Sequence, residues 1–353
     1  MQLLQIYIGG VRNNSLFFLE QQELYFYSIF IPYLEKNNIK DVWILGDFFE
    51  HRKVLSIFTL NKAVKFLKTL QDKNINTIMI LGNHDVVYRN TNEFNSISPI
   101  FKSFSNIKII DKFEVIKFDD INIGFISWIN QDIRSECIDW IKTNNASILC
   151  GHFEINSFEI VKGVVCNNGL NQDLFEKYDK VFSGHFHIRA NNGIIYYIGN
   201  PYQTNWGEYG FEKGFAVFNT IDKSVEFIEN PTKIYETIVY NEQIDFLKFD
   251  FKYYTNKIVR IYSDPRKEKN KKTLELFIEK LSSYVYSLEL IEDKDVIVNN
   301  EDEDKELYQT ADTIQLINQF LTSCEINNLD KKQLQESIFE IYREAIEKGI
   351  NEC

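Results

Sequence analysis

The chain repeats one local pattern four times in its first 190 residues: an apolar run with strand character ends at a glycine, and the next residue can ligate a metal. The junctions are 42–45 followed by Gly46 and Asp47, 78–81 followed by Gly82 and Asn83, 147–150 followed by Gly151 and His152, and 180–183 followed by Gly184 and His185. Continuous apolar runs of this length suit strands that are covered on both faces. The pattern therefore predicts an α/β fold with buried strands.

Helical patterns separate the early strands, near residues 20–36 and 57–71, so the start of the chain alternates strand and helix. Strands that are connected in this way pair in parallel. In such sheets ligands collect at the carboxyl ends of the strands, where the backbone turns sharply and glycine removes the steric penalty. We therefore expect the four ligand-capable residues of these junctions to meet at one edge.

The region from 111 to 229 has a different pattern. Short apolar runs, such as 121–129 and 193–198, are separated by Asn and Gly turns, which predicts a second and largely antiparallel sheet. Taken with the first strands, this favours a layered α/β–β/α sandwich of two mixed sheets flanked by helices, in one domain over residues 1–234.

Residues 235–294 predict a small α/β capping domain, because strand patterns at 258–262 and 287–291 flank a helical pattern at 271–282. Residues 295–309 are acidic and poor in core residues, as in a linker. The last segment, 310–353, predicts a helical pair whose second helix has an apolar face. Two helices alone bury too little surface to fold independently, so we expect this pair to dock on a partner.

Composition excludes several classes of protein. No stretch reaches the roughly 20 uninterrupted apolar residues of a membrane span, and the sequence does not begin with a signal-peptide pattern, so we expect a soluble, cytoplasmic protein. Five scattered cysteines fit neither a disulfide framework nor a thiolate zinc site. A formal net charge of −12 excludes a grip on nucleic acid by nonspecific attraction alone. It does not exclude a nuclease, because bound divalent cations can bring phosphate to an acidic protein.

Histidines are concentrated at the glycine junctions. Of the five in the chain, four lie at or just after them: His84, His152, His185 and His187. A lone histidine would be interpreted as a buried, hydrogen-bonded imidazole, but four of them beside Asp47 and Asn83 indicate a metal site. Imidazole, carboxylate and amide donors without thiolate suit Mn²⁺, Fe or Zn²⁺ rather than a structural zinc finger.

The motifs around these residues have a characteristic order. They are Gly46-Asp47-Phe48-Phe49-Glu50, Gly82-Asn83-His84-Asp85, Gly151-His152 and Gly184-His185-Phe186-His187, supported by Ser127-Trp128 and Tyr197-Ile198-Gly199-Asn200-Pro201. In order and spacing they resemble those of the calcineurin-like metallophosphoesterases. Within that family they resemble the SbcD-like nuclease subunits of double-strand-break repair complexes, including the phage members of that group.

The resemblance implies a role for each matching position. Asp47 would bridge two cations, Mn²⁺ or Mg²⁺, while Asn83, His152 and His185 would complete one site and His187 would belong to the other. His84 would not hold the metals. It would stabilise the transition state or protonate the leaving oxygen, with the Glu50 side chain orienting it and favouring its charged form.

One expected motif is missing. The family has Asp-x-His at the end of its first strand, whereas residues 3–10 contain neither residue, although the segment from Val11 to Ser15 resembles the one after that motif in the family. Three explanations stay open: a miscalled coding sequence or short deletion, a protein that works with one firmly held metal, or an inactive scaffold. Loss of two donors should weaken one metal site severely.

Several cationic and aromatic side chains lie close to the motifs. Arg12, Arg52, Lys53, Arg89 and Arg189 could meet a DNA backbone, and solvated surface charge is an equally good interpretation of each. Tyr88 and Trp206 could stack on bases, but core packing is the expected fate of both in a chain so rich in aromatic residues.

These observations support three functional hypotheses. The first is a Mn²⁺- or Mg²⁺-dependent DNA exo- or endonuclease that acts in recombination and double-strand-break repair. By resemblance, its partner would be an SbcC-like coiled-coil ATPase bound through the C-terminal helices, and it could form a homodimer. The second hypothesis is a phosphoesterase acting on small or protein-borne phosphates. The third is a non-catalytic binding module that retains the fold.

Overall fold

A computed structural model describes residues 2–4, 15–88, 90–161, 163–241, 244–266, 271–292 and 337–338. The chain divides into two compact units. Unit 1 comprises residues up to Thr204 and Gly210–Thr232, and unit 2 comprises Asn205–Tyr209 and the described residues from Lys233 onward. The expected linker and almost all of the expected C-terminal helical pair lie outside the described residues, so the four-domain division stays a prediction.

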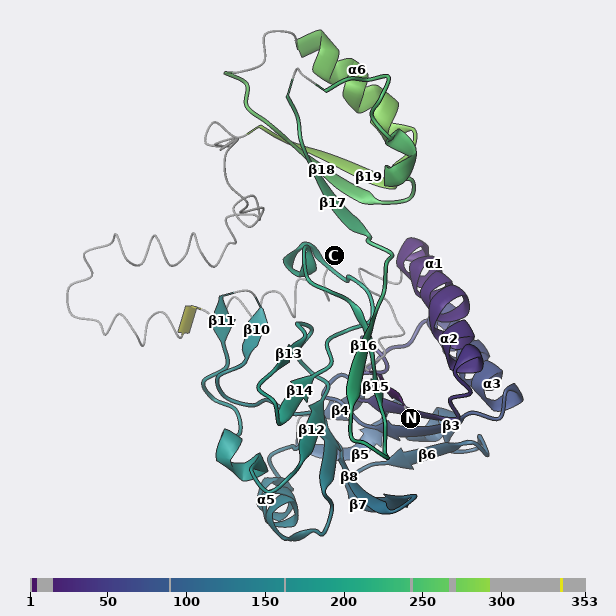
Figure 1. Ribbon diagram of the computed structural model, residues 1–353, viewed down its shortest axis with the longest axis vertical. Helices are drawn as coiled ribbons and strands as arrows, with labels where there is room; N and C mark the ends of the chain where they lie inside the picture. Colours follow the sequence, from purple (N-terminus) through teal and green to yellow (C-terminus); the bar gives the residue numbers. More distant parts are fainter. Residues whose placement is uncertain are drawn as a thin grey trace, which may run out of the picture. The chain divides into compact units, whose positions relative to one another are not determined.

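Unit 1 contains two six-stranded sheets (Figure 1). The first has the order β16 (Val225–Glu229), β15 (Gly214–Phe218), β1 (Gln2–Leu4), β2 (Asp41–Leu45), β3 (Asn76–Ile80) and β6 (Ile107–Ile110). Strands β1, β2, β3 and β6 pair in parallel, as the alternation of strand and helix predicted. β15 and β16 add an antiparallel edge to this sheet.

The second sheet has the order β13 (Ala190–Asn191), β14 (Ile195–Tyr197), β12 (Lys180–Ser183), β9 (Ile148–Gly151), β8 (Ile121–Ile126) and β7 (Phe113–Phe118). Its four central strands pair in parallel, so the expectation of a largely antiparallel sheet was wrong. Helix α5 (Arg134–Thr143) connects β8 to β9 and makes parallel pairing possible. The sequence pattern did not reveal that helix.

Helices cover the outer faces of the two sheets, which confirms the layered α/β–β/α sandwich. A continuous helical segment, formed by α1 (Leu16–Tyr25), a π-helical turn η1 (Phe26–Phe30) and α2 (Ile31–Lys36), packs with α3 (Ile57–Asp72) on the first sheet. The Phe26 and Phe66 rings lie 4.4 Å apart, and Phe30 meets Phe215 of β15 at 5.2 Å. Short α4 (Ser98–Phe101) precedes β6, and helix α5 with the 3₁₀ turn η2 (Gln172–Phe175) covers the second sheet.

The main core lies between the sheets. Trp43 of β2 is fully buried and packs edge-to-face on Phe125 of β8 at 5.2 Å, and Phe182 of β12 meets Phe218 of β15 at the same separation. Close packing of these rings holds the carboxyl ends of β2 and β3 next to those of β9 and β12. The cysteines among the described residues, Cys137, Cys150 and Cys166, are buried and form no disulfide with one another.

Two hairpins complete unit 1. One is formed by β4 (Val86–Tyr88) and β5 (Thr91–Asn95), and the other by β10 (Glu159–Val161) and β11 (Val164–Val165). The first hairpin begins directly after the Gly82–Asp85 motif. Its position relative to that motif is therefore fixed by a very short stretch of chain.

Unit 2 contains a parallel sheet of β17 (Tyr235–Val239), β18 (Ile258–Ser263) and β19 (Ser287–Glu292), with helix α6 (Lys271–Ser282) and 3₁₀ turns η3 (Trp206–Glu208) and η4 (Phe251–Tyr254). Its core includes Val259, Ile261 and Phe277. Trp206 packs on Tyr235 at 4.8 Å with the Arg260 guanidinium over its ring, which confirms a packing role. Among the described residues, no helix has the length and apolarity that crossing a membrane requires.

Candidate metal centre

Four strand ends from the two sheets supply the residues of the site. Asp47 follows β2, Asn83 follows β3, His152 follows β9 and His185 follows β12. Asp47 and His185 have positive φ values, of 50° and 78° respectively, a region that side-chain-bearing residues rarely adopt. Backbone strain of this kind persists only where surrounding structure imposes it, and it concentrates at functional sites.

Two glycines allow these loops to approach one another. A Cβ atom on Gly82 would lie 2.1 Å from Asp47 Oδ1 and 2.2 Å from the Asp47 backbone nitrogen. A Cβ atom on Gly184 would lie 2.2 Å from the carbonyl oxygen of Leu45, which belongs to the other sheet. Gly82 and Gly184 are therefore required because backbones of different strand ends meet at these positions.

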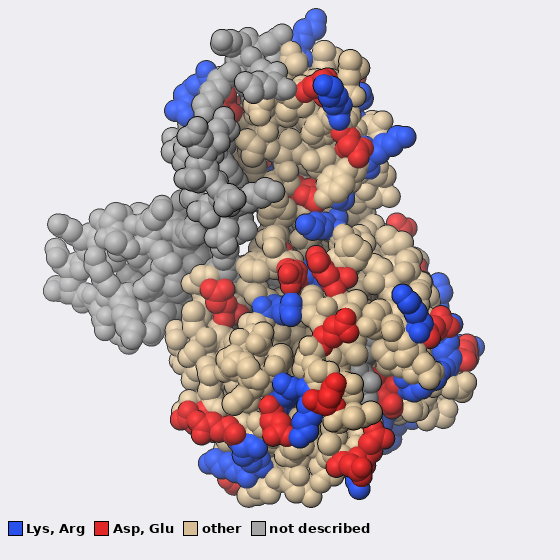
Figure 2. Space-filling model, viewed as in Figure 1, with Lys and Arg blue, Asp and Glu red and all other residues tan. Residues whose placement is uncertain are grey.

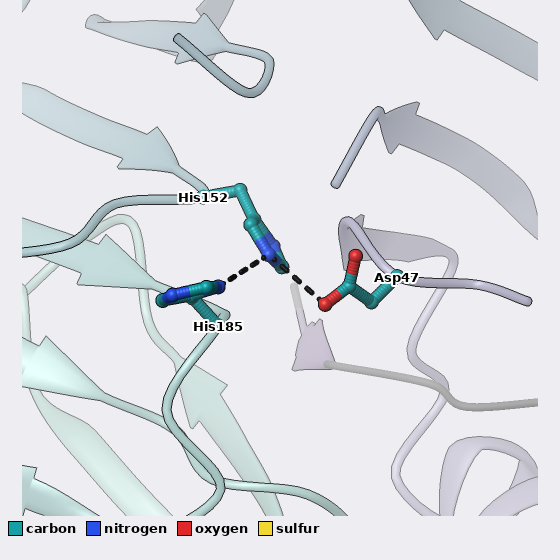
Figure 3. Close-up of side chains that lie close together, drawn as sticks. All are labelled: Asp47, His152 and His185. Atoms are coloured by element: carbon teal, nitrogen blue, oxygen red, sulfur yellow. Dashed lines mark hydrogen bonds and ion pairs between the residues drawn. The ribbon is translucent and has the colours of Figure 1, made fainter. Parts of the chain in front are cut away.

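The side chains that follow the four strands converge, and Figure 3 shows Asp47, His152 and His185 facing one another. His152 Nε2 lies 3.1 Å from Asp47 Oδ2, 3.0 Å from Asn83 Oδ1 and 3.1 Å from His185 Nδ1. His185 Nδ1 lies 2.9 Å from Asn83 Oδ1. Asp47 and His152 are almost completely buried, whereas His185 retains some exposure. The expected convergence at strand ends is present, although it joins two sheets rather than one.

Outer contacts set the tautomers of both imidazoles. His152 Nδ1 lies 2.7 Å from the Leu45 carbonyl oxygen, which can only accept, so Nδ1 carries a proton that it donates to that oxygen. His185 Nε2 lies 3.1 Å from the Glu154 carboxylate and donates to it in the same way. In the neutral ring, each remaining nitrogen then directs a lone pair toward Asn83 Oδ1. Carboxylate, amide and imidazole lone pairs that converge without a proton between them fit a divalent cation.

The electrostatics favour positive charge in this pocket. Burial by itself raises the pKa of Asp47, but the imidazoles of His152 and His84 outweigh it and hold that pKa well below its usual range. Burial lowers the pKa of His152. The charge and hydrogen bond of Asp47, together with smaller contributions from Leu45 and Asp85, outweigh burial, so the net shift of this pKa is upward. Burial lowers the pKa of His185, which keeps its ring neutral and able to ligate. The ionised Asp47 therefore stabilises a cation at this point, whether a proton or a metal ion.

His84 lies beside the cluster and interacts with it through its backbone. Its amide nitrogen donates to Asp47 Oδ1 at 2.7 Å. Its Nδ1 lies 2.8 Å from the backbone carbonyl oxygen of Glu50, so Glu50 contacts this ring through its backbone, whereas the sequence led us to expect the side chain to orient it. A backbone carbonyl can accept only, and so it fixes the proton on Nδ1. Burial lowers the pKa of His84, but Asp47 and Glu50 raise it more, so the net shift is upward.

Three residues support the site although the sequence analysis assigned them no role. Asp85 is fully buried and accepts the backbone amides of Phe49 at 3.1 Å and Gly82 at 2.8 Å, joining two of the ligand loops. Burial and the nearby charge of Asp47 raise the pKa of Asp85 to about 7. Glu154 holds His185, and the Trp128 ring lies 5.3 Å from that of His185. Asp85 and Trp128 belong to the sequence motifs, whereas Glu154 carried no signal beyond its place after His152.

The other expected site residues are placed differently. His187 is not part of the described cluster of possible ligands. It acts electrostatically to lower the pKa of Glu50, but burial has the larger effect and the net shift of that pKa is upward. Arg52 is half-buried, Lys53 is exposed, and Arg52 acts electrostatically on His84. Arg189 is paired with Glu212 at 2.7 Å and lies 3.9 Å above the Phe227 ring. Arg12 and Arg89 lie outside the described residues, as do residues 5–10 where the first motif would be.

Tyr88 also differs from expectation. Its side chain is 53% exposed, so the prediction that it packs in the core was wrong. Tyr88 is the last residue of β4, in a two-stranded hairpin that belongs to neither six-stranded sheet.

A two-sheet α/β sandwich whose strand ends gather carboxylate, amide and imidazole donors defines a metal-dependent hydrolytic enzyme. Residues 23–189 match the family described as calcineurin-like phosphoesterase. The chain is 32% identical over 317 residues to a protein of Enterobacteria phage T4 named Exonuclease subunit 1, and the match covers 89% of this chain and 90% of that protein. This chain belongs to the calcineurin-like phosphoesterase family, whose members use divalent metal ions.

Two weaker similarities complete the comparison. A protein of Acanthamoeba polyphaga mimivirus named Uncharacterized protein R555 is 27% identical over 207 residues, covering 55% of this chain and 15% of that protein. A solved structure described as a novel archaeal phosphodiesterase matches with a TM-score of 0.32 and 16% identity, covering 65% of this chain and 100% of that one. That structural likeness is too slight to carry an argument.

Proposed function

We propose that this protein is a divalent-metal-dependent nuclease that hydrolyses DNA phosphodiesters in recombination and double-strand-break repair. The observation that carries the proposal is the convergence of Asp47, Asn83, His152 and His185, with His84 held beside them. The phage relative named Exonuclease subunit 1 supports the choice of a nucleic-acid substrate, because the similarity extends over nearly the whole of both chains.

Asp47, Asn83, His152 and His185 would hold a cation, and we propose Mn²⁺ or Mg²⁺ because carboxylate and amide oxygens, which Asp47 and Asn83 supply, suit these ions. When bound, such an ion polarises a phosphodiester and supplies a hydroxide at neutral pH. Leu45 and Glu154 contribute by holding the two imidazoles in the tautomers that ligation requires. His187 would serve a second ion, and Gln5 to Arg12 stand where further ligands to that ion would be expected.

His84 is the proposed general acid. Its Nδ1 proton is donated to the Glu50 carbonyl oxygen, so Nε2 is the nitrogen that would act on a substrate. The raised pKa of His84 favours the imidazolium, so Nε2 can donate a proton to the leaving oxygen of the cleaved diester. Asp47 would contribute both to holding the metal ion and to positioning His84. One of its carboxylate oxygens accepts the His84 backbone amide, and the other faces His152.

The test separates catalysis from metal binding. His84→Ala should reduce Mn²⁺-dependent cleavage of a linear DNA by about 100-fold or more, since general acid catalysis contributes roughly 10²–10⁴-fold. Mn²⁺ affinity, measured by calorimetry, should stay within about threefold of the wild type, because His84 contributes no ligand atom to the cluster. His51→Ala removes the neighbouring histidine outside the motifs and is the matched control, which should retain activity.

Two results would contradict this function. A strong preference for phosphomonoesters over single- and double-stranded DNA would indicate a phosphoesterase acting on small or protein-borne phosphates. No hydrolysis at millimolar Mn²⁺, with His84→Ala indistinguishable from the wild type, would indicate a binding module that has lost catalysis through its missing Asp-x-His motif.

An ATPase partner is part of the proposal. The relative's name, Exonuclease subunit 1, describes one component of a larger enzyme, and the net charge of −12 argues that a partner contributes much of the grip on DNA. We propose an SbcC-like coiled-coil ATPase bound through residues 310–353. Truncation before residue 310 should abolish co-purification with that ATPase and leave hydrolysis of a small diester intact.

Self-association is the remaining proposed interaction. Val54, which precedes α3, and Ile57 and Phe58, which begin it, are 74%, 75% and 63% exposed, and neighbouring exposed apolar side chains of this kind mark association surfaces. Light scattering coupled to size exclusion should give a dimer mass for the wild type and a monomer mass for Ile57→Glu. A monomeric wild type would contradict a homodimer.

A further inference from the structure

We infer that the β4–β5 hairpin is a base-stacking element that receives an unpaired nucleobase of the substrate next to the cleavage site. The inference rests on the proposed nuclease function and adds a substrate class to it: DNA with unpaired bases, as in single strands and frayed ends. Tyr88 of β4 and Phe94 of β5 are the residues that carry the stacking.

These two rings form an exposed pair, whereas more than half of the aromatic residues that the structure describes are buried. Tyr88 is 53% exposed and Phe94 is 55% exposed, and their centroids lie 5.7 Å apart at 89° in an edge-to-face arrangement. Two neighbouring aromatic side chains left in water forgo the favourable free energy of burial. Such a pair, with more than half of each side chain open, indicates a surface that another flat apolar group covers.

Buried asparagines hold the hairpin firmly against the site. Asn92 of β5 donates through Nδ2 to the carbonyl oxygens of Asp111 at 2.9 Å and Trp128 at 3.1 Å. Its own Oδ1 accepts from Asn130 at 3.0 Å. Trp128 is the residue whose ring lies beside both His152 and His185. The hairpin and the imidazoles therefore share one supporting residue.

A second connection joins the other side of the hairpin to the ligand loops. The Ser96 amide, directly after β5, donates to the carbonyl oxygen of Asp85 at 2.8 Å. Asp85 in turn binds the backbone of Gly82 and Phe49 through its side chain. Because these contacts are short and mostly buried, the aromatic pair is held at a defined position relative to the metal ligands.

The short chain segment between His84 and Tyr88 limits the distance between the aromatic pair and the proposed catalytic histidine. Tyr88 follows His84 by four residues, so their Cα atoms can be at most about 14 Å apart at full extension. Bases in a stacked strand repeat about every 3.4 Å. A base only a few nucleotides from the scissile phosphate can therefore reach the rings.

Stacking also suits the charge of the protein. On the face in Figure 2, acidic and basic side chains of the described residues are interspersed, and the whole chain has a net charge of −12. Aromatic stacking binds bases of any sequence without requiring a basic surface, and each stacked base contributes about 1–3 kcal/mol. Bases inside a duplex already have both faces covered, so an unpaired base is the favoured occupant.

The test uses the full chain with Mn²⁺ and the double variant Tyr88→Ala/Phe94→Ala. On a single-stranded oligonucleotide, kcat/KM should fall about 5- to 150-fold, mainly through KM, which is the kinetic equivalent of one stacked base. On an oligonucleotide of abasic residues, and on bis(4-nitrophenyl) phosphate, the variant and the wild type should agree within about twofold. The conservative pair Tyr88→Phe/Phe94→Tyr should restore the wild-type KM, since it keeps both rings.

Ile221→Ala is the matched control, because Ile221 is 89% exposed in the same unit and is remote in sequence from every site residue. Equal KM values for the double variant and the wild type on the single strand would overturn the inference while leaving the nuclease function intact. If the wild type hydrolyses no diester, the proposed function fails. Quenching of a 2-aminopurine oligonucleotide by the wild type, but not by the double variant, then decides the stacking question separately.

Discussion

The two halves of the proposed metal centre are built in different ways. Asp47 and Asn83, from the first sheet, supply oxygen donors whose position is set by the backbone, with Asp85 joining their loops through two amides. His152 and His185, from the second sheet, supply nitrogen donors whose orientation is set by acceptors on the outer side of each ring. The oxygen half therefore depends on loop geometry and charge, whereas the imidazole half depends on tautomer control.

The halves are also interlocked. His152 donates to Leu45, the last residue of β2, so an imidazole of the second sheet is held by a strand of the first. Gly184 of the second sheet approaches the same carbonyl oxygen so closely that no Cβ atom could be accommodated there. A substitution in either half should consequently disturb the other half, and the effect should be larger the closer the substituted residue lies to the Leu45 carbonyl oxygen.

The largest effect is expected from Asp47→Asn, which removes the only negative charge among the four donors. Mn²⁺ affinity should fall by about 100-fold or more, because affinity depends on ligand charge as well as ligand number. Calorimetric titration with Mn²⁺ measures the change, and cleavage of DNA should be lost with it. An unchanged Mn²⁺ dissociation constant would contradict the proposal that Asp47 provides the negative charge that binds the ion.

A smaller effect is expected on the imidazole side from Glu154→Ala, which removes the acceptor of His185 Nε2. Loss of an outer acceptor of this kind typically weakens metal binding about 10- to 100-fold. Glu154→Gln keeps a carbonyl oxygen that can accept, and should recover most of the affinity. Glu159→Ala, on the exposed strand β10, is the control. Equal losses in Glu154→Gln and Glu154→Ala would contradict tautomer control.

Asp85→Asn should affect stability more than chemistry. The amide nitrogen cannot accept, so one of the Phe49 and Gly82 amides would lose its buried partner at a cost of about 1–3 kcal/mol. Urea unfolding followed by circular dichroism measures the free energy of unfolding. Asp120→Asn on the exposed β7–β8 turn should leave that free energy unchanged. A loss no larger than that of the control would mean that Asp85 does not join the ligand loops.

The smallest effect is expected from Arg189→Ala. Its guanidinium is engaged by Glu212 and the Phe227 ring, and partly exposed ion pairs contribute about 0–1 kcal/mol. The KM for DNA should change by less than about twofold, and the free energy of unfolding should fall only slightly. A tenfold rise in KM would instead support Arg189 as a DNA-binding residue.

Local patterns predicted several features well. Parallel pairing of β2 with β3, the strands and helix of unit 2, and the placement of all four donors directly after strands could be inferred from residue order. Each depends on interactions between residues near in sequence, such as alternation of apolar positions and glycine at a sharp turn. The order and parallel pairing of β8, β9 and β12 could not be inferred in the same way, because the short apolar runs and Asn/Gly turns of this region favoured antiparallel strands and no helix was expected at α5.

The sequence by itself determined which residue types stand at the strand ends, because glycine and the donor after it are adjacent in the chain. Only the tertiary structure decided that the donors come from two sheets, that Glu50 presents its backbone to His84, that Glu154 holds His185, and that Tyr88 is exposed. These contacts join residues 31 to 107 positions apart. They arise from how strand ends meet within each sheet and across the two sheets, and no local propensity encodes that arrangement.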